Sequence, residues 1–287
     1  MTVFVGLLCI ILSTLIIIIQ ADTRLNNTSL EATGTFDWTV VNTSVWLSAA
    51  SYCNTKDYLT RTYNGPSTGF KPVVAIDEKT YDTQGFVGYL SAQKKIYVVF
   101  RGSTSITDWL EDLSELLCSS DYCNGCSVHC GFQETEKKAF PLVLDAVLKV
   151  HSMFPDYSIV VTGHSLGAAV GTLVTLDLLA SKLGVPISLH NFGCPRIGNT
   201  NFATFASNAI SDKTRNTHYK DIVPHVPMHE RYTHISGEWY EPVEVFDGHT
   251  IKECTGFEDP TCSYQWHVTS IDDHMHYLGL ELSCDKV

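Results

Sequence analysis

The stretch YSIVVTGHSLGAAVG, from Tyr157 to Gly171, decides the fold of this chain. Strand-forming residues at 157–162 lead into a serine between two glycines, and a small-residue helical pattern follows. A Gly-x-Ser-x-Gly string alone arises readily by chance, because glycine and serine are common residues. Between a buried strand and a helix, however, it is typical of a nucleophile elbow, the tight turn that raises a serine above the edge of a sheet.

The residues around Ser165 fit such a turn. Gly163 and Gly167 remove side chains that would collide where backbone crosses backbone. The N-terminus of the following helix directs free amides at the serine, so the amide of Leu166 is placed to stabilise an oxyanion. The alternative interpretation of Ser165 is an ordinary N-cap of a buried helix. We expect His164 to face the core, because adjacent side chains on such a turn point apart.

Strands and helices alternate on both sides of the elbow. On its N-terminal side the pattern predicts a hairpin with strands at 86–91 and 96–100, and a helix at 133–153. Further along the chain it predicts strand 157–162, helix 165–183, strand 186–192, helix 199–209, strand 214–220 and two more strands within 231–247. This alternation indicates an α/β fold, with a central, mostly parallel sheet and helices on both faces.

Composition narrows the function classes. The chain has 287 residues and a formal net charge of −12, and it shows no linker or internal repeat, which favours one domain. An acidic surface argues against binding nucleic acid, which needs clustered Lys and Arg. It also argues against electrostatic recruitment to anionic lipid, so any membrane contact would be hydrophobic.

The N-terminus indicates export. An apolar run from Val3 to Ile19 is followed by Ala21 and polar sequence, which predicts a secretory signal peptide at 1–21 and a mature chain at 22–287. The expected location is therefore extracellular or the lumen of the secretory pathway. An uncleaved membrane anchor is the alternative, because no Lys or Arg precedes the run and its length approaches a membrane span. Sequons that fit a glycosylated surface occur at Asn26, Asn27 and Asn42.

Cysteine usage agrees with an oxidising compartment. Two groups of closely spaced cysteines, CSSDYCNGCSVHC and CTGFEDPTC, indicate disulfide bonds within each group. The pairings that we expect are Cys118–Cys130, Cys123–Cys126, Cys254–Cys262 and Cys53–Cys284. Spacing does not prove connectivity, and zinc binding is the alternative for the first group. With Cys9 set aside in the predicted signal peptide, Cys194 is left over, and we expect it to be a buried free thiol.

A serine nucleophile needs a histidine to take its proton and an acid to orient that histidine. In elbow-type hydrolases these follow the serine in the order acid, then histidine. Asp221, in HYKDIVPHVP, stands where a strand gives way to a Pro-containing loop, although a solvated loop Asp is the alternative. The residues alone do not choose among the histidines that follow, which are His225, His229, His234, His249, His267, His274 and His276. The pair in DDHMHY has no evident third ligand for a metal.

Seven ordered motifs carry a family resemblance over roughly residues 50–285: VVFRGSTSITDWL, VHCGF, VTGHSLGAAV, FGCPRIGN, KDIVPHVP, YTHISGEWY and DDHMHYLG. With them the chain resembles the fungal-type (class 3) lipases. The resemblance implies an α/β-hydrolase fold with the catalytic domain at 22–287, Ser165 as nucleophile and Asp221 as acid. It implies His274 as base, in a His-x-x-Tyr pattern, with His276 as the alternative. The residue after FRG, Ser103, would be a second oxyanion donor beside Leu166.

The resemblance also assigns a short helical lid to SITDWLED. The apolar residues that fall on one face of this helix are Ile106, Trp109, Leu110 and Leu113. Ser105 and Asp108 would cap its start. An ordinary amphipathic surface helix is the alternative, and the cysteine group that follows would limit how far a lid swings.

The function implied is a secreted serine esterase that hydrolyses acylglycerols through an acyl-enzyme, without metal or cofactor. Its expected partners are a lipid or other ester substrate and, transiently, a lipid interface, with no nucleic acid and no obligate protein partner. Phospholipase A1 and feruloyl-type esterase are alternatives on the same fold. A lipid-binding pseudoenzyme is the alternative from another class.

Overall fold

The computed structural model describes residues 36–113 and 116–287. The main sheet of these residues consists of β1 (Lys71–Glu78), β2 (Thr83–Leu90), β3 (Lys95–Phe100), β6 (Ser158–His164), β7 (Ile187–Phe192), β8 (Lys213–His218), β9 (Glu238–Glu241) and β10 (Lys252–Glu253). Two small sheets pair β4 (Leu117–Ser119) with β5 (Ser127–His129) and β11 (His276–Tyr277) with β12 (Leu280–Glu281). The α-helices are α2 (Trp38–Ala50), α3 (Ile106–Asp112), α4 (Cys130–Met153), α5 (Leu166–Ala180) and α6 (Thr200–Ala209). The predicted signal peptide lies outside the described residues.

The sheet is parallel in its middle and antiparallel at its edges. The strand order is β1-β2-β3-β6-β7-β8-β9-β10 within the described residues. Pairs from β3 to β9 are parallel, whereas β1–β2, β2–β3 and β9–β10 are antiparallel. The predicted α/β fold with a mostly parallel centre is therefore confirmed. Functional groups of such sheets gather beyond the carboxyl ends of the parallel strands.

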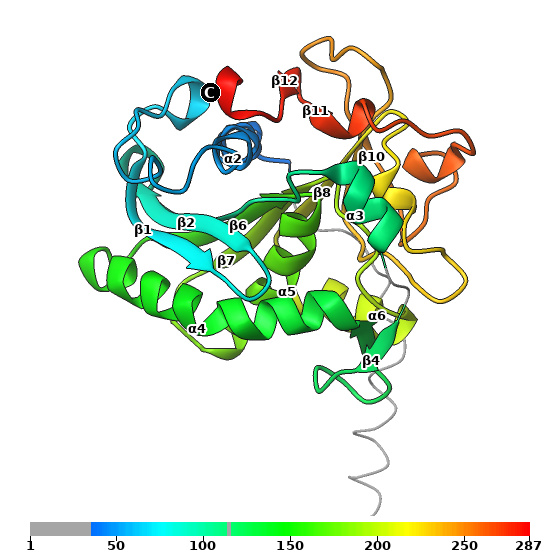
Figure 1. The fold of residues 1–287 in the computed structure, drawn as a ribbon, viewed down its shortest axis with the longest axis horizontal. Helices are drawn as coiled ribbons and strands as arrows, with labels where there is room; N and C mark the ends of the chain where they lie inside the picture. Colours follow the sequence, from blue (N-terminus) through cyan, green and yellow to red (C-terminus); the bar gives the residue numbers. More distant parts are fainter. Residues whose placement is uncertain (1–35, 114–115) are drawn as a thin grey trace, which may run out of the picture. The chain divides into compact units, whose positions relative to one another are not determined.

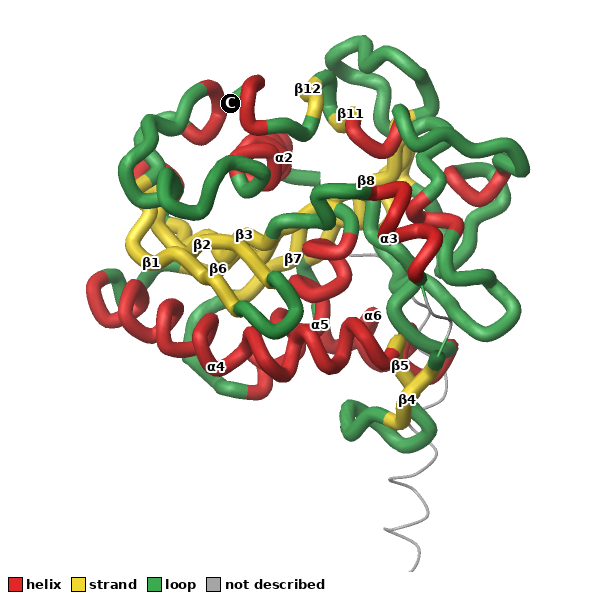
Figure 2. The backbone as a smooth tube through the Cα atoms, in the orientation of Figure 1, coloured by secondary structure: helices red, strands yellow, loops and turns green. Residues whose placement is uncertain are grey.

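Helices cover both faces of the sheet (Figures 1 and 2). Along β3, Ile96 and Val98 belong to the apolar cluster formed with α4 and α5, while Tyr97 and Val99 belong to the cluster formed with α2. This alternation is the two-residue period of a strand buried on both faces. Strand β3 is therefore buried between the two helical layers.

Several elements differ from the predictions, and strands β1, β4, β5, β10, β11 and β12 were not predicted. Only β9 forms within 231–247, where two strands were expected, because Pro242 follows it directly and has no N–H for a ladder. The helix expected at 133–153 begins earlier, at Cys130. Helix α2 was not predicted: 9 of its 13 residues are buried on several sides, so its sequence lacks the one-sided pattern of a surface helix.

The structure joins the same four cysteine pairs that the spacing suggested. They are Cys53–Cys284, Cys118–Cys130, Cys123–Cys126 and Cys254–Cys262. Because the cysteines of the first close group are all in disulfides, no thiolate is left there for zinc. Cys194 is a buried free thiol, and burial raises its pKa to about 12. The sequon at Asn42 lies inside α2, and the other two lie outside the described residues.

Candidate active site

Ser165 stands in a strained turn between β6 and α5. Its φ of 59° and ψ of −129° are unusual for a residue with a side chain, and such strain persists where the surroundings impose it. The close backbone crossing shows why the glycines are needed. A Cβ on Gly163 would lie 2.5 Å from the carbonyl oxygen of Gly167, and one on Gly167 would lie 2.6 Å from that of Phe100. The turn has the form of a nucleophile elbow.

The side chain of Ser165 is fully buried, and its Oγ has no hydrogen-bond partner among the described residues. It sits at the N-terminus of α5, a 15-residue helix. The first amides of a helix have no acceptor within the helix, so the Leu166 N–H is available to a group at the serine. The hydroxyl is therefore neither capping the helix nor bound elsewhere, which argues against the N-cap interpretation.

His274 and Asp221 are in direct contact. The Nδ1 of His274 lies 3.0 and 2.9 Å from the two carboxylate oxygens of Asp221, and both side chains are buried. Two further donors converge on this carboxylate: the Val223 N–H at 2.8 Å and the Tyr277 hydroxyl at 2.5 Å. Burial and the charge of Asp221 raise the pKa of Tyr277 well above its usual value, so its hydroxyl keeps the proton that it donates.

The other ring nitrogen of His274, Nε2, is also buried and has no hydrogen-bond partner in the described part of the chain. Gly193 allows this ring to sit where it does. A Cβ on Gly193 would lie 2.8 to 2.9 Å from atoms of His274 and Asp221. Because the residue has a φ of 56°, any side chain there would also strain the backbone. Ser165 Oγ and His274 Nε2 are thus two buried groups that each retain an open hydrogen-bonding position.

The structure separates the histidines that the sequence left open. The Nδ1 of His276 contacts the backbone carbonyl of Asp272 at 2.9 Å, away from Asp221. His225 does approach Asp221, but it contacts the backbone carbonyl, at 2.9 Å, and not the carboxylate. His234 binds the carbonyl of Pro224 at 2.7 Å. Among the described histidines, only His274 has a hydrogen bond to the Asp221 carboxylate.

Ser103 follows β3 on the neighbouring loop. The loop is anchored by Arg101, which pairs with Asp82 at 2.8 Å and also donates to Gln84. Beside it lies a cavity of about 230 Å³ that Ser103 and Leu166 both line, together with Trp109. The two predicted oxyanion donors therefore face one hollow next to the elbow.

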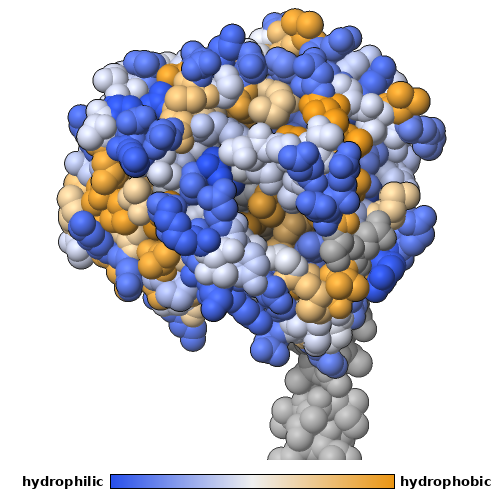
Figure 3. Space-filling view, in the orientation of Figure 1, coloured by the Kyte–Doolittle hydropathy of each residue, from blue (hydrophilic) through white to orange (hydrophobic). Residues whose placement is uncertain are grey.

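The predicted lid is helix α3. The Ser105 hydroxyl accepts from the Asp108 N–H at 3.4 Å, which is the expected N-cap. Ile106 is buried, and the Trp109 ring stacks on Phe132 with centroids 6.5 Å apart and planes 14° from parallel. The remaining two residues of the predicted face, Leu110 and Leu113, are half-buried. Figure 3 shows a hydrophilic outer surface at α3 and apolar atoms in the hollow beside it.

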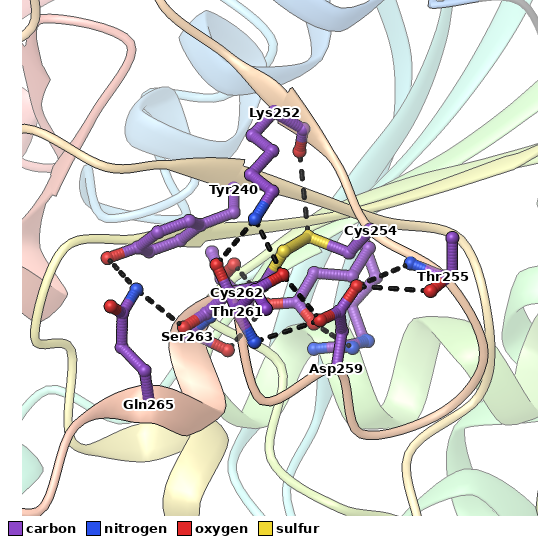
Figure 4. The surroundings of a disulfide bond; sticks show 12 residues. Tyr240, Lys252, Cys254, Thr255, Asp259, Thr261, Cys262, Ser263 and Gln265 are labelled. Carbon is purple, nitrogen blue, oxygen red and sulfur yellow. Dashed lines mark hydrogen bonds and ion pairs between the residues drawn. A yellow bond between two sulfur atoms is a disulfide. The ribbon is translucent and has the colours of Figure 1, made fainter.

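The loop closed by Cys254–Cys262 is held by several polar contacts of its own (Figure 4). Lys252 donates to the carbonyl and the hydroxyl of Thr261, at 2.7 and 2.6 Å, across the base of the loop. Asp259 accepts from the backbone N–H groups of Thr255 and Thr261, at 2.9 and 2.8 Å. These contacts fix the loop, and they were not predicted, because their partners are irregular backbone groups.

Within residues 36–113 and 116–287, one group of three possible metal ligands was found, Cys254, Asp259 and Cys262. Its two sulfurs are bonded to each other in a disulfide. No helix in these two ranges is long and apolar enough to cross a membrane.

The chain was compared with known proteins. The sequence profile of the family described as Lipase (class 3) matches residues 97–231. A lipase from Rhizomucor miehei is 34% identical over 206 residues, which are 70% of this chain and 56% of that protein. Secreted mono- and diacylglycerol lipase 1 from Fusarium solani is 31% identical over 228 residues, 78% of this chain and 64% of that protein. The chain thus spans less than two thirds of these two curated relatives.

A solved structure covers the fold more completely. It belongs to a triacylglycerol lipase whose catalytic centre is described as a serine protease triad. It aligns with a TM-score of 0.78 and 30% identity, over 85% of this chain and 95% of that chain. With the elbow, the His–Asp contact and the sheet order in place, we conclude that the chain belongs to the class 3 lipase family.

Proposed function

We propose that this protein is a secreted serine esterase that hydrolyses ester bonds of acylglycerols. In this proposal Ser165 is the nucleophile, His274 the general base and Asp221 the acid that orients the base. The observation that carries the proposal is the buried contact of 2.9 Å between His274 Nδ1 and Asp221, which leaves the opposite ring nitrogen open. A serine hydroxyl is a weak nucleophile without such a base.

The chemistry follows from the open positions. His274 Nε2 accepts the proton of Ser165 as Oγ attacks the ester carbonyl, and then protonates the departing alcohol. Water, activated in the same way, releases the fatty acid from the acyl-enzyme and restores the serine. Asp221 accepts from His274 Nδ1 throughout, which fixes the ring and stabilises the positive charge that it acquires. In the described structure Ser165 and His274 are not hydrogen-bonded, and such bonds often form only with substrate present.

The backbone amides of Leu166 and Ser103 are the proposed oxyanion donors. Both residues line the cavity beside the elbow. Negative charge builds on the carbonyl oxygen during attack, and fixed N–H groups stabilise it without reorganisation. The removal of one such donor typically costs about 3 kcal/mol of transition-state stabilisation.

Helix α3 is the proposed lid, and its position supports a lipid substrate. Trp109 lines the cavity beside the elbow, and opening would transfer Trp109, Ile106, Leu110 and Leu113 from the protein to a lipid interface. Removal of apolar surface from water contributes roughly 25 cal/mol per Å². When the lid opens, these side chains lose their contacts with the protein, and burial in lipid compensates for that loss. The Fusarium relative is named as a secreted mono- and diacylglycerol lipase, which supports export and acylglycerols as the substrate class here.

Substrate profiling of the purified mature chain tests this proposal. Initial rates are compared on emulsified triolein and diolein, phosphatidylcholine vesicles and methyl ferulate, with Ser165→Ala as the blank. We expect the acylglycerols to be cleaved fastest. Preferential cleavage of phosphatidylcholine or of methyl ferulate would replace the acylglycerol assignment with one of those esterase classes. No hydrolysis of any ester would refute the enzyme assignment itself.

A further inference from the structure

A hydrogen-bonded chain that the triad chemistry does not use reaches the proposed base. His164 Nε2 lies 2.8 Å from the backbone carbonyl oxygen of His274, and His164 Nδ1 lies 2.6 Å from the hydroxyl of Tyr52. The two imidazole rings are close neighbours, with centroids 4.2 Å apart. Residues 52, 164 and 274 are far apart in sequence, so the fold alone brings them together.

The partners determine the tautomer of His164. A carbonyl oxygen only accepts, so Nε2 must carry the ring proton and donate a hydrogen bond to the backbone carbonyl of His274. Nδ1 is then unprotonated and accepts a hydrogen bond from the Tyr52 hydroxyl. Burial, reinforced by the neighbouring His274, lowers the pKa of His164 well below its usual value, and burial raises that of Tyr52. The pair is therefore neutral, which suits a site next to an imidazole that becomes positively charged during the reaction.

Tyr52 is itself held firmly. It lies two positions after the end of helix α2, and its N–H donates to the carbonyl of Ala49 at 3.1 Å. The next residue, Cys53, is bonded to Cys284. The Tyr52 hydroxyl also packs against Gly102, the residue before Ser103. The Tyr52 hydroxyl oxygen thus contacts the loop that carries Ser103 and, through His164, the segment that carries His274.

We propose that Tyr52 and His164 are positioning residues for His274. The Tyr52 hydroxyl selects the His164 tautomer whose Nε2–H holds the His274 carbonyl, and this hydrogen bond fixes the base relative to Ser165. Because His164 directly precedes Ser165, base and nucleophile are tied to each other through adjacent residues. This inference rests on the function proposed above, in which His274 is the general base.

Two amide substitutions of His164 form the main test. The side-chain N–H of Gln sits at the ε position and that of Asn at the δ position, so His164→Gln retains a donor toward His274 and His164→Asn does not. We expect kcat on a soluble short-chain ester to stay within about threefold of wild type for His164→Gln and to fall about a hundredfold for His164→Asn, as for a misplaced catalytic group. KM is expected to change less than about twofold, because neither variant alters the ester-binding surface.

Tyr52→Phe gives a second, milder variant that removes one oxygen atom. Without the hydroxyl donor, His164 can adopt the tautomer that is protonated at Nδ1. In that tautomer Nε2 has no proton and cannot donate a hydrogen bond to the His274 carbonyl. We expect kcat to fall about tenfold at unchanged KM. Tyr63→Phe is the matched control, because it removes a buried hydroxyl that donates to the Tyr58 carbonyl at 2.9 Å, away from the site. His190→Gln, on β7, is the control for a buried histidine.

Thermal unfolding and fluorophosphonate labelling are measured for every variant, so that loss of folding is recognised. Equal kcat for His164→Gln and His164→Asn, both folded, would overturn the positioning role. If either His164 variant fails to fold, the comparison of Tyr52→Phe with Tyr63→Phe decides, and equal kcat would overturn it. These outcomes leave wild-type activity and labelling intact, whereas absence of both in the wild type would refute the proposed function instead.

Discussion

Arg196, which is buried, and the partly buried Glu258 form a two-point ion pair, with Nε and Nη2 of the arginine 2.8 and 3.0 Å from the two carboxylate oxygens. Glu258 lies on the loop that Cys254–Cys262 closes. The remaining guanidinium nitrogen donates to the carbonyls of His225 and Pro227, at 2.6 and 2.9 Å. The pair therefore connects the disulfide-closed loop to the segment that follows Asp221.

Removal of Glu258 is expected to destabilise the protein. Glu258→Ala leaves the buried Arg196 charge without its partner, which typically costs about 3–5 kcal/mol of the free energy of unfolding. Denaturant unfolding measures the loss, and Glu230→Ala, at an exposed position nearby, is the control. A loss equal to that of the control would show that the ion pair does not stabilise the fold.

The same pair predicts an acid limit of stability. Burial acts to raise the pKa of Glu258, but His234 and Arg196 outweigh it and hold the pKa at about 2. Because the folded-state pKa lies below the unfolded value, this contribution is present above about pH 4.5 and is lost as the pH falls toward about 2. Glu258→Gln should flatten the unfolding free energy against pH in that window, and an unchanged pH slope would contradict the account.

Tyr277 is expected to support the acid of the triad. Its hydroxyl donates to Asp221 at 2.5 Å, so Tyr277→Phe removes one of the donors that hold the carboxylate in register with His274. We predict a fall in kcat of about tenfold at little changed KM, since a hydrogen bond to a charged group contributes about 1.5–3 kcal/mol. Steady-state kinetics on a soluble ester, beside Tyr63→Phe, provide the check. A change in KM alone would show that Tyr277 serves binding.

Trp109 is expected to matter most at an interface. Trp109→Ala removes the ring that stacks on Phe132 and would meet lipid when α3 opens. We predict about a tenfold loss of rate on emulsified triolein and less than about a threefold loss on a soluble short-chain ester, because only the first substrate supplies apolar surface. Thr107→Ala, on the exposed side of α3, is the control. Equal losses on both substrates would argue against a lid.

Two buried glutamates predict that stability falls as the pH rises above about 4.5. Burial raises the pKa of Glu136 to about 8, with Asp177 adding to the shift, and burial alone raises that of Glu241 to about 8. Both values exceed the usual 4.5, so the folded state binds the proton more tightly and stability decreases as pH rises from about 4.5 to 8. Glu136→Gln should reduce this decrease, measured by thermal unfolding against pH, whereas Asp145→Asn, exposed on α4, should not.

The elbow and the central strands could be predicted from sequence because their signals are local. The glycines that permit the turn at Ser165 stand within two residues of it, and buried strands such as β3 show as apolar runs. The apolar face of α3 likewise follows from helical spacing. Helix α2 lacked such a signal, because it is buried on several sides.

The partners of the site could not be predicted from the residues alone. His274 and Asp221 are 53 positions apart, and His164 and Tyr52 are 112 apart, so only the fold determines which groups meet. The family resemblance selected His274, whereas no motif indicated Tyr52 or the Arg196–Glu258 pair. Such long-range contacts depend on the paths of the loops that connect the strands and helices, and no hydrophobic periodicity predicts the path of a loop.

The most direct test of the account is covalent labelling of Ser165. The purified wild-type chain is treated with a fluorophosphonate probe, the modified peptide is identified by mass spectrometry, and Ser165→Ala is treated in parallel. We predict a single label on Ser165 in the wild type, none in the variant, and a loss of esterase activity of at least about a thousandfold in the variant. Labelling of another residue, or an active Ser165→Ala protein, would contradict the central claim that Ser165 is the nucleophile.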